Sequence, residues 1–154
     1  MILRSVLYGA AAGAAGTTML NAVTYLDMAL RGRPASSTPE QTVERLSELT
    51  HLQVPGDDDT REARLQGLGP LSGLVTGIGA GVLLGPARSA GLRPAAAGGA
   101  TLATLLALVG STGPMTALGI TDPRSWSPTD WISDLVPHAA YGLVADAVLR
   151  ALDS

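Results

Sequence analysis

Several polar residues of this chain stand inside otherwise apolar stretches, and their types and spacing could support proton chemistry. Asp134, His138, Gly142, Asp146 and Arg150 recur at every fourth position and would share one winding face of a helix. A carboxylate one helical turn from an imidazole can fix the tautomer of the ring or hold it protonated. The pattern therefore indicates either a proton relay or small-cation site, or a structural clamp between helices, and the clamp is favoured.

A clamp needs a partner for the imidazole, because an unpaired ring nitrogen in hydrocarbon costs kilocalories. We expect His138 to face other helices and to bond to the first apolar segment, with Asn21 as the candidate partner. The candidate intramembrane polar cluster comprises Asn21, Asp27, Asp134, His138 and Tyr141.

The remaining composition argues against most catalytic and binding classes. The chain has no cysteine, which excludes thiolate metal sites and thiol nucleophiles, and its net charge of −3 offers no basic surface for nucleic acid. Metalloprotease, nucleophile-elbow and phosphate-loop motifs are also missing. The sequence therefore predicts a protein that is not an enzyme and has no cofactor and no metal site.

The distribution of charge along the chain predicts the helices that hold the polar residues described above. Of the 154 residues only 15% are charged, and twelve of the twenty-three charges fall between positions 31 and 64. A bilayer core about 30 Å thick is crossed by about 20 apolar helical residues. The prediction is an all-α fold, a four-helix transmembrane bundle forming one membrane domain (1–154), with a short amphipathic helix in the polar loop 31–64. The predicted spans are residues 5–30, 65–86, 95–118 and 131–152.

Glycines at four-residue spacing are the clearest pattern in two of these spans. On a membrane helix they form a groove that admits a neighbouring backbone closely. The alternative is that an Ala/Gly-rich composition produced the spacing by chance. The predicted helix-packing residues are Gly9, Gly13, Gly69, Gly73, Gly77, Gly81 and Gly85.

The stretch His138-Ala139-Ala140-Tyr141-Gly142, with a glycine-rich first helix that ends near Arg31-Gly32-Arg33-Pro34, resembles small bacterial four-helix inner-membrane proteins of the YagU type. The resemblance implies a multi-pass inner-membrane protein without an established activity and supplies no catalytic residues. Together with the glycine pattern, it predicts a structural or accessory protein that packs through its glycine-rich helix faces. Its expected partners are the lipid bilayer and either further copies of itself or other membrane subunits. The alternative is a small transporter or proton-conducting or ion-conducting protein that uses the Asp134/His138 face. Arginines in the short acid-free loop 86–94 favour cytoplasmic N- and C-termini.

Overall fold

A computed structural model describes residues 2–153, which form five α-helices and no strand, so the all-α prediction is confirmed. Local signals mark the end of the first helix and the start of the third. Gly32, with φ +63°, follows the first helix, and Asp57 caps the third by accepting a hydrogen bond from the Thr60 backbone N–H at 3.0 Å. The elements are α1 (Ile2–Arg31), α2 (Thr38–Thr50), α3 (Asp58–Ser89), α4 (Ala96–Ala117), the 3₁₀ turn η1 (Pro123–Ser125) and α5 (Pro128–Asp153).

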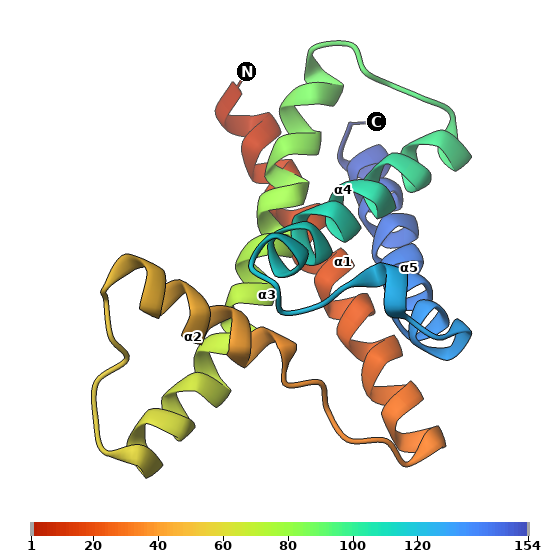
Figure 1. Cartoon of the computed structure of the whole chain (residues 1–154). Coiled ribbons are helices and arrows are strands. Elements are labelled where there is room, and N and C mark those ends of the chain that lie inside the picture. Colours follow the sequence, from red (N-terminus) through yellow and green to blue (C-terminus); the bar gives the residue numbers. More distant parts are fainter. Residues whose placement is uncertain (1, 154) are drawn as a thin grey trace.

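The helices are arranged around α1, which packs against both α3 and α5 in the two most extensive helix pairs of the fold (Figure 1). α4 packs mainly on α5 and to a smaller extent on α3. In Figure 1 α4 is inclined across the other long helices and does not run alongside them. A regular up-down bundle of four parallel or antiparallel helices, as the sequence predicted, is therefore not confirmed.

Three helices, α3, α4 and α5, are long and apolar enough to cross a membrane. They contain the predicted spans 65–86 and 131–152 entirely, and nearly all of 95–118. α1 has the length but is not among these three, and its middle holds the polar residues Thr17, Thr18 and Asn21.

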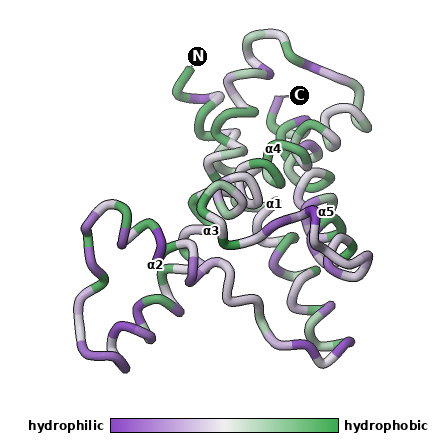
Figure 2. Tube along the Cα trace, viewed as in Figure 1, coloured by the Kyte–Doolittle hydropathy of each residue, from purple (hydrophilic) through white to green (hydrophobic). Residues whose placement is uncertain are grey.

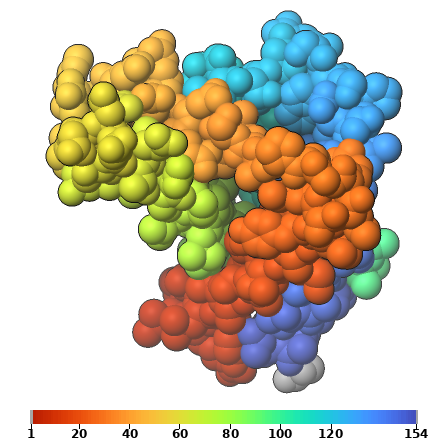
Figure 3. Space-filling model, turned by 90° about the horizontal axis from the view of Figure 1, so that it is seen from below, coloured from red at the N-terminus to blue at the C-terminus, as the bar shows by residue number. Residues whose placement is uncertain are grey.

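The charged loop forms a separate helical arm made of α2 and the first turns of α3, where purple hydrophilic stretches alternate with green hydrophobic ones in Figure 2. An ion pair joins the two halves of the arm, because the Arg61 guanidinium lies 2.6 Å from the Glu44 carboxylate. Seen from below in Figure 3, the arm projects away from the rest of the molecule. A short amphipathic helix was predicted here, and α2 leaves Leu46 and Leu49 exposed on one side.

The core among the long helices is built largely from small side chains, which is why the helices approach one another closely. Tyr141 is the one large side chain in it that is fully buried, among the residues described. The cluster consists of Ala12, Ala80, Leu84, Ala103, Ala107, Tyr141, Ala145 and Leu149.

Candidate functional site

Five of the seven glycines singled out in the sequence lie where α1 crosses α3. A Cβ atom built on Gly13 would lie 2.7 Å from the Gly77 carbonyl oxygen, and one built on Gly81 would lie 2.6 Å from the Gly13 Cα. Real Cβ atoms do not approach backbone so closely, so only glycine fits. The others at this crossing are Gly9, which faces Gly81, and Gly85, which faces Ser5.

The other two glycines have different surroundings. Gly69 lies against the α2 residue Glu40, whose backbone nitrogen would be 3.0 Å from an added Cβ. Gly73 faces open space, with no heavy atom within 4 Å of a Cβ placed there. The α1–α3 contact therefore ends between Gly77 and Gly73, and below this level the two helices diverge.

Tyr141 connects this crossing to α5. Its hydroxyl donates a hydrogen bond to the Gly77 carbonyl oxygen at 2.7 Å, and its ring lies over Gly16, where an added Cβ would approach Cδ2 to 2.7 Å. The predicted polar-cluster residue Tyr141 thus joins α1, α3 and α5. Gly16 was missed by the sequence argument because it lies outside the four-residue spacing.

His138 bonds to α4 and not to α1. Its Nε2 lies 2.9 Å from the Ser111 hydroxyl, and its Nδ1 lies 2.7 Å from the backbone carbonyl oxygen of Asp134. Only 7% of the residue is exposed, in agreement with the expectation that the ring faces other helices. The expected bond to Asn21 is absent, since Asn21 lies on an exposed part of α1 and has no hydrogen-bond partner among residues 2–153.

The Ser111 hydroxyl, the His138 imidazole and the Asp134 carboxylate follow one another in space in the same succession as the three groups of a catalytic serine triad. The Asp134 Oδ1 lies 3.5 Å from His138 Nδ1, farther than the backbone carbonyl that the same nitrogen contacts. Acyl transfer also needs free donors aimed at the developing oxyanion. Ser111 lies within α4, where interior N–H groups bond to carbonyls one turn earlier, and its hydroxyl also contacts the Leu108 carbonyl oxygen at 3.1 Å. This geometry fits a bond between helices better than a reaction centre.

Asp27, the last member of the predicted cluster, is separate from His138. Its carboxylate accepts hydrogen bonds from Arg31 at 2.7 Å and from Arg33 at 2.6 Å, at the end of α1. This ion-paired group stabilises the turn that leaves α1.

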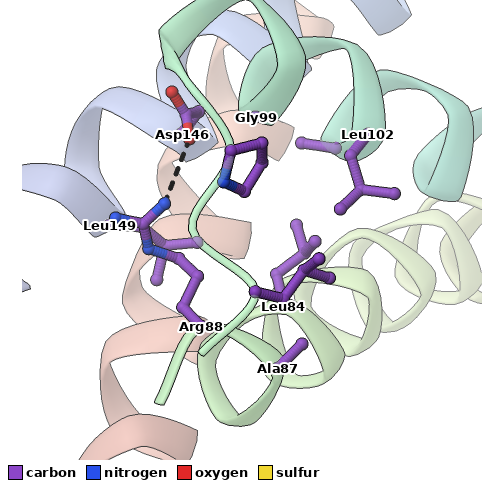
Figure 4. Close-up of a pocket in the computed structure, with 10 residues that line it drawn as sticks. Leu84, Ala87, Arg88, Gly99, Leu102, Asp146 and Leu149 are labelled. Carbon is purple, nitrogen blue, oxygen red and sulfur yellow. Dashed lines mark ion pairs between the residues drawn. The ribbon is translucent and has the colours of Figure 1, made fainter. Parts of the chain in front are cut away.

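A second polar centre, at the opposite end of the helices, was only half visible in the sequence. Asp146 and Arg150 were recognised as one helical turn apart, and their side chains pair at 2.6 Å. The structure adds Arg88 from the end of α3, whose guanidinium lies 3.5 Å from Asp146 (Figure 4). The same guanidinium lies 2.9 Å from Asp153. Arg88 and Asp146 are 8% and 6% exposed. Arg150 also donates to the Pro94 carbonyl oxygen at 2.7 Å, so this network joins α3, α5 and the loop before α4.

Glycine again makes room for these groups, because a Cβ at Gly99 would lie 2.7 Å from the Asp146 carboxyl carbon. Beside the ion pairs is a cavity of about 10 Å³, lined by Leu84, Leu102 and Leu149 among others, with room for about one water molecule. The cavity is too small for a substrate or cofactor. Within residues 2–153 no group of three His, Asp or Glu side chains could hold a metal ion.

The chain matches no protein family, no curated protein and no solved structure.

Proposed function

We propose that this chain is a multi-pass protein of a bacterial inner membrane with four spans, in which α1 is the fourth spanning helix beside α3, α4 and α5. Support comes from the position of α1, which packs against two of the three apolar helices in the two most extensive helix pairs of the fold. Its polar residues are partly satisfied there, since the buried Thr17 hydroxyl donates to the Gly13 carbonyl oxygen at 2.8 Å. A helix in this place needs less apolar surface than one surrounded by lipid.

The role we propose is structural or accessory, and not enzymatic. The observation that carries it is the use made of the buried polar side chains, which join helices to one another. His138 bonds α5 to α4, Tyr141 bonds α5 to α3, and Arg88 bonds α3 to α5. Groups satisfied in this way contribute to a stable scaffold and leave little hydrogen-bonding capacity for a substrate. The resemblance to YagU-type proteins is part of this proposal, because the stretch that carries it, residues 138–142, lies in α5 and contains His138 and Tyr141.

The glycines of the α1–α3 crossing are enclosed within one chain, so a partner protein would bind elsewhere. Extraction from native membranes in a mild detergent, followed by mass determination of the intact particle, tests the accessory role. We expect the chain to be recovered with a stoichiometric membrane partner or with further copies of itself. Recovery as a monomer alone, at membrane concentrations and after chemical cross-linking, would contradict the proposal.

The orientation that we propose places both termini in the cytoplasm. The two termini and the α3–α4 loop lie at one end of the molecule (Figure 1), which carries Arg4, Arg88, Arg93 and Arg150. Because the chain has no cysteine, single cysteines report position directly. Ser36→Cys should react with an impermeant thiol reagent in intact cells, and Ser89→Cys should react only after permeabilisation. The reverse pattern would invert the orientation, and labelling of both in intact cells would refute four spans.

A second candidate function, proton or small-cation conduction, is favoured by one observation. The Asp134 Oδ2 atom is buried without a hydrogen-bond partner in the described structure, beside the His138 ring. Purified protein in liposomes with an imposed pH gradient tests this candidate. Flux that is lost in Asp134→Asn and retained in Asp27→Asn would support conduction, and absence of flux would leave the structural role.

A further inference from the structure

One face of α1 is used by no other part of the described chain. α1 meets α3 through Gly9 and Gly13 and meets α5 through Gly16, so its remaining side points outward. Six residues on this outward side follow one another at alternating spacings of four and three, which is the repeat of a coiled-coil seam. We call them the α1 seam: Leu7, Ala11, Ala14, Thr18, Asn21 and Tyr25.

The α1 seam is open to its surroundings. Leu7 and Tyr25 are both 59% exposed, and of the six residues only Ala14 is partly covered. Figure 3 shows the second half of α1 at the molecular surface. α3 does not cover the second half of the α1 seam either, because it diverges from α1 beyond the tight contact at Gly77, where Gly73 faces open space.

Asn21 makes this open face costly in a membrane. The residue lies six positions before Asp27, the first charged residue that follows it on α1, or about 9 Å from it along the helix axis at 1.5 Å per residue. Its amide has two donors and an acceptor oxygen, and lipid tails satisfy none of them. Among the residues that the structure describes, Asn21 has no hydrogen-bond partner. A neighbouring helix with donors and acceptors at the same depth would remove this cost.

We propose that the α1 seam binds the α1 seam of a second copy of this chain, with the two Asn21 amides hydrogen-bonded to each other. The inference rests on the proposed membrane crossing of α1. Two copies inserted in the same orientation and related by a two-fold axis along the membrane normal bring Asn21 to the same depth. An amide both donates and accepts, so the pair is self-complementary. A single Asn in an apolar heptad seam also fixes register and oligomeric state in coiled coils.

The rest of the α1 seam fits this geometry. Ala11, Ala14 and Thr18 are small, which permits the close approach that helix association in lipid requires. The Thr18 hydroxyl is already bonded to the Ala14 carbonyl oxygen at 2.9 Å and adds no unpaired donor. A repeat of alternating four and three residues follows a left-handed crossing, as in most membrane bundles, so contact can continue from Leu7 to Tyr25. The glycine crossing of α1 with α3 is on another side of the helix, so both contacts can exist together.

Oxidative cross-linking in native membranes tests the proposal, because the natural chain has no cysteine. Thr18→Cys and Met19→Cys form a matched pair, since both positions are exposed and adjacent but Met19 points away from the α1 seam. We expect Thr18→Cys to give a disulfide-linked species of twice the 15.6 kDa chain mass and Met19→Cys to give none. Equal cross-linking of the two variants, or none at Thr18→Cys, would overturn the proposal. A cross-linked species of another mass would assign the α1 seam to a different protein and would also overturn it.

Substitution of Asn21 provides the second measurement. Asn21→Leu should raise the dimer dissociation constant in detergent about tenfold, the effect of losing a polar contact between membrane helices, and Asn21→Gln should retain most of the affinity. Far-UV circular dichroism establishes that each variant is folded. Unchanged dimerisation in Asn21→Leu would refute the role of the amide.

Failure of the seam and failure of the membrane crossing are distinguishable. In sealed vesicles of either orientation, Thr18→Cys should resist an impermeant thiol reagent if α1 crosses the bilayer. Protection without cross-linking would reject only the dimer. Ready labelling would reject the crossing, and the dimer with it.

Discussion

Replacing Gly81 with alanine separates the effect of close helix packing from the effect of glycine on the helix itself. Gly73→Ala is the matched control, since both glycines lie on α3 and are two four-residue steps apart. The control position is open, with no heavy atom within 4 Å of an added Cβ. At Gly81 the added methyl group would meet the backbone of α1, which cannot move aside as a side chain can.

The magnitude follows from the distances. An added Cβ on Gly81 would lie 2.6 Å from the Gly13 Cα, and an ordinary contact begins at 3.4 Å, so the helices must separate by at least about 0.8 Å. Overpacking of this kind costs about 1–3 kcal/mol. The opposing gain in helix propensity from glycine to alanine is about 1 kcal/mol in water, and it is the only expected effect at Gly73. Gly81→Ala should therefore be less stable than Gly73→Ala by about 1–3 kcal/mol.

The free energy of unfolding can be compared by titrating the detergent-solubilised protein with a denaturing detergent and following far-UV circular dichroism. We expect Gly73→Ala to unfold at or above the wild-type midpoint and Gly81→Ala to unfold below it. Equal midpoints for the two variants would refute the inference that backbone contact at the α1–α3 crossing requires glycine.

Three further predictions concern polar groups. A double-mutant cycle of His138→Leu and Ser111→Ala in the same unfolding assay should give a coupling of about 1 kcal/mol, and zero coupling would remove the proposed bond between α5 and α4. Arg88→Met should cost about 2 kcal/mol in that assay, because Asp153 loses its ion-pair partner and the buried Asp146 keeps only Arg150, and a cost below about 1 kcal/mol would contradict the network. Hydrogen bonds from Thr60 hold the pKa of Asp57 below its usual value of 3.8, so its contribution to stability is complete above pH 3.8 and is lost as the pH falls through the lower, folded-state pKa. Amide exchange at the start of α3 should therefore accelerate in acid in the wild type relative to Asp57→Asn, which caps without titrating, and equal exchange in the two proteins would contradict this.

The sequence predicted most helix positions because charge, proline and glycine act locally. The arm follows from the charges of residues 31–64, and the start of α3 follows from the capping preference of Asp57. The glycine spacing indicated close approach along α3 from Gly69 to Gly85, whereas the structure has backbone close to an added Cβ at Gly81 and no heavy atom within 4 Å of one at Gly73. Spacing defines a face of a helix, whereas contact depends on where the two helix axes diverge, and that depends on the whole packing.

Partners of buried polar groups could not be predicted in the same way. The sequence placed His138 in the interior because of the cost of leaving a ring nitrogen unpaired, but the same cost is removed by any acceptor at the right depth. Asn21 and Ser111 were equally able to remove it, and only the inclination of α4 brings Ser111 to 2.9 Å. The partner of Arg88 was hidden for a similar reason, because Asp153 lies 65 residues away.

The polar and small residues in the first half of α1 follow from the same packing. A helix packed against others needs less apolar surface than one surrounded by lipid, and α1 forms the two most extensive helix pairs of the fold. Its Ser5, Gly9, Gly13 and Thr17 are buried against α3, where small or internally bonded residues pack better than leucine. Beyond Thr17, α1 and α3 diverge, so this explanation no longer applies. α1 nevertheless carries a further polar residue, Asn21. If α1 is a membrane span, as we propose, a polar residue at that position needs a partner from outside the chain, and the partner that we propose is the α1 seam of a second copy.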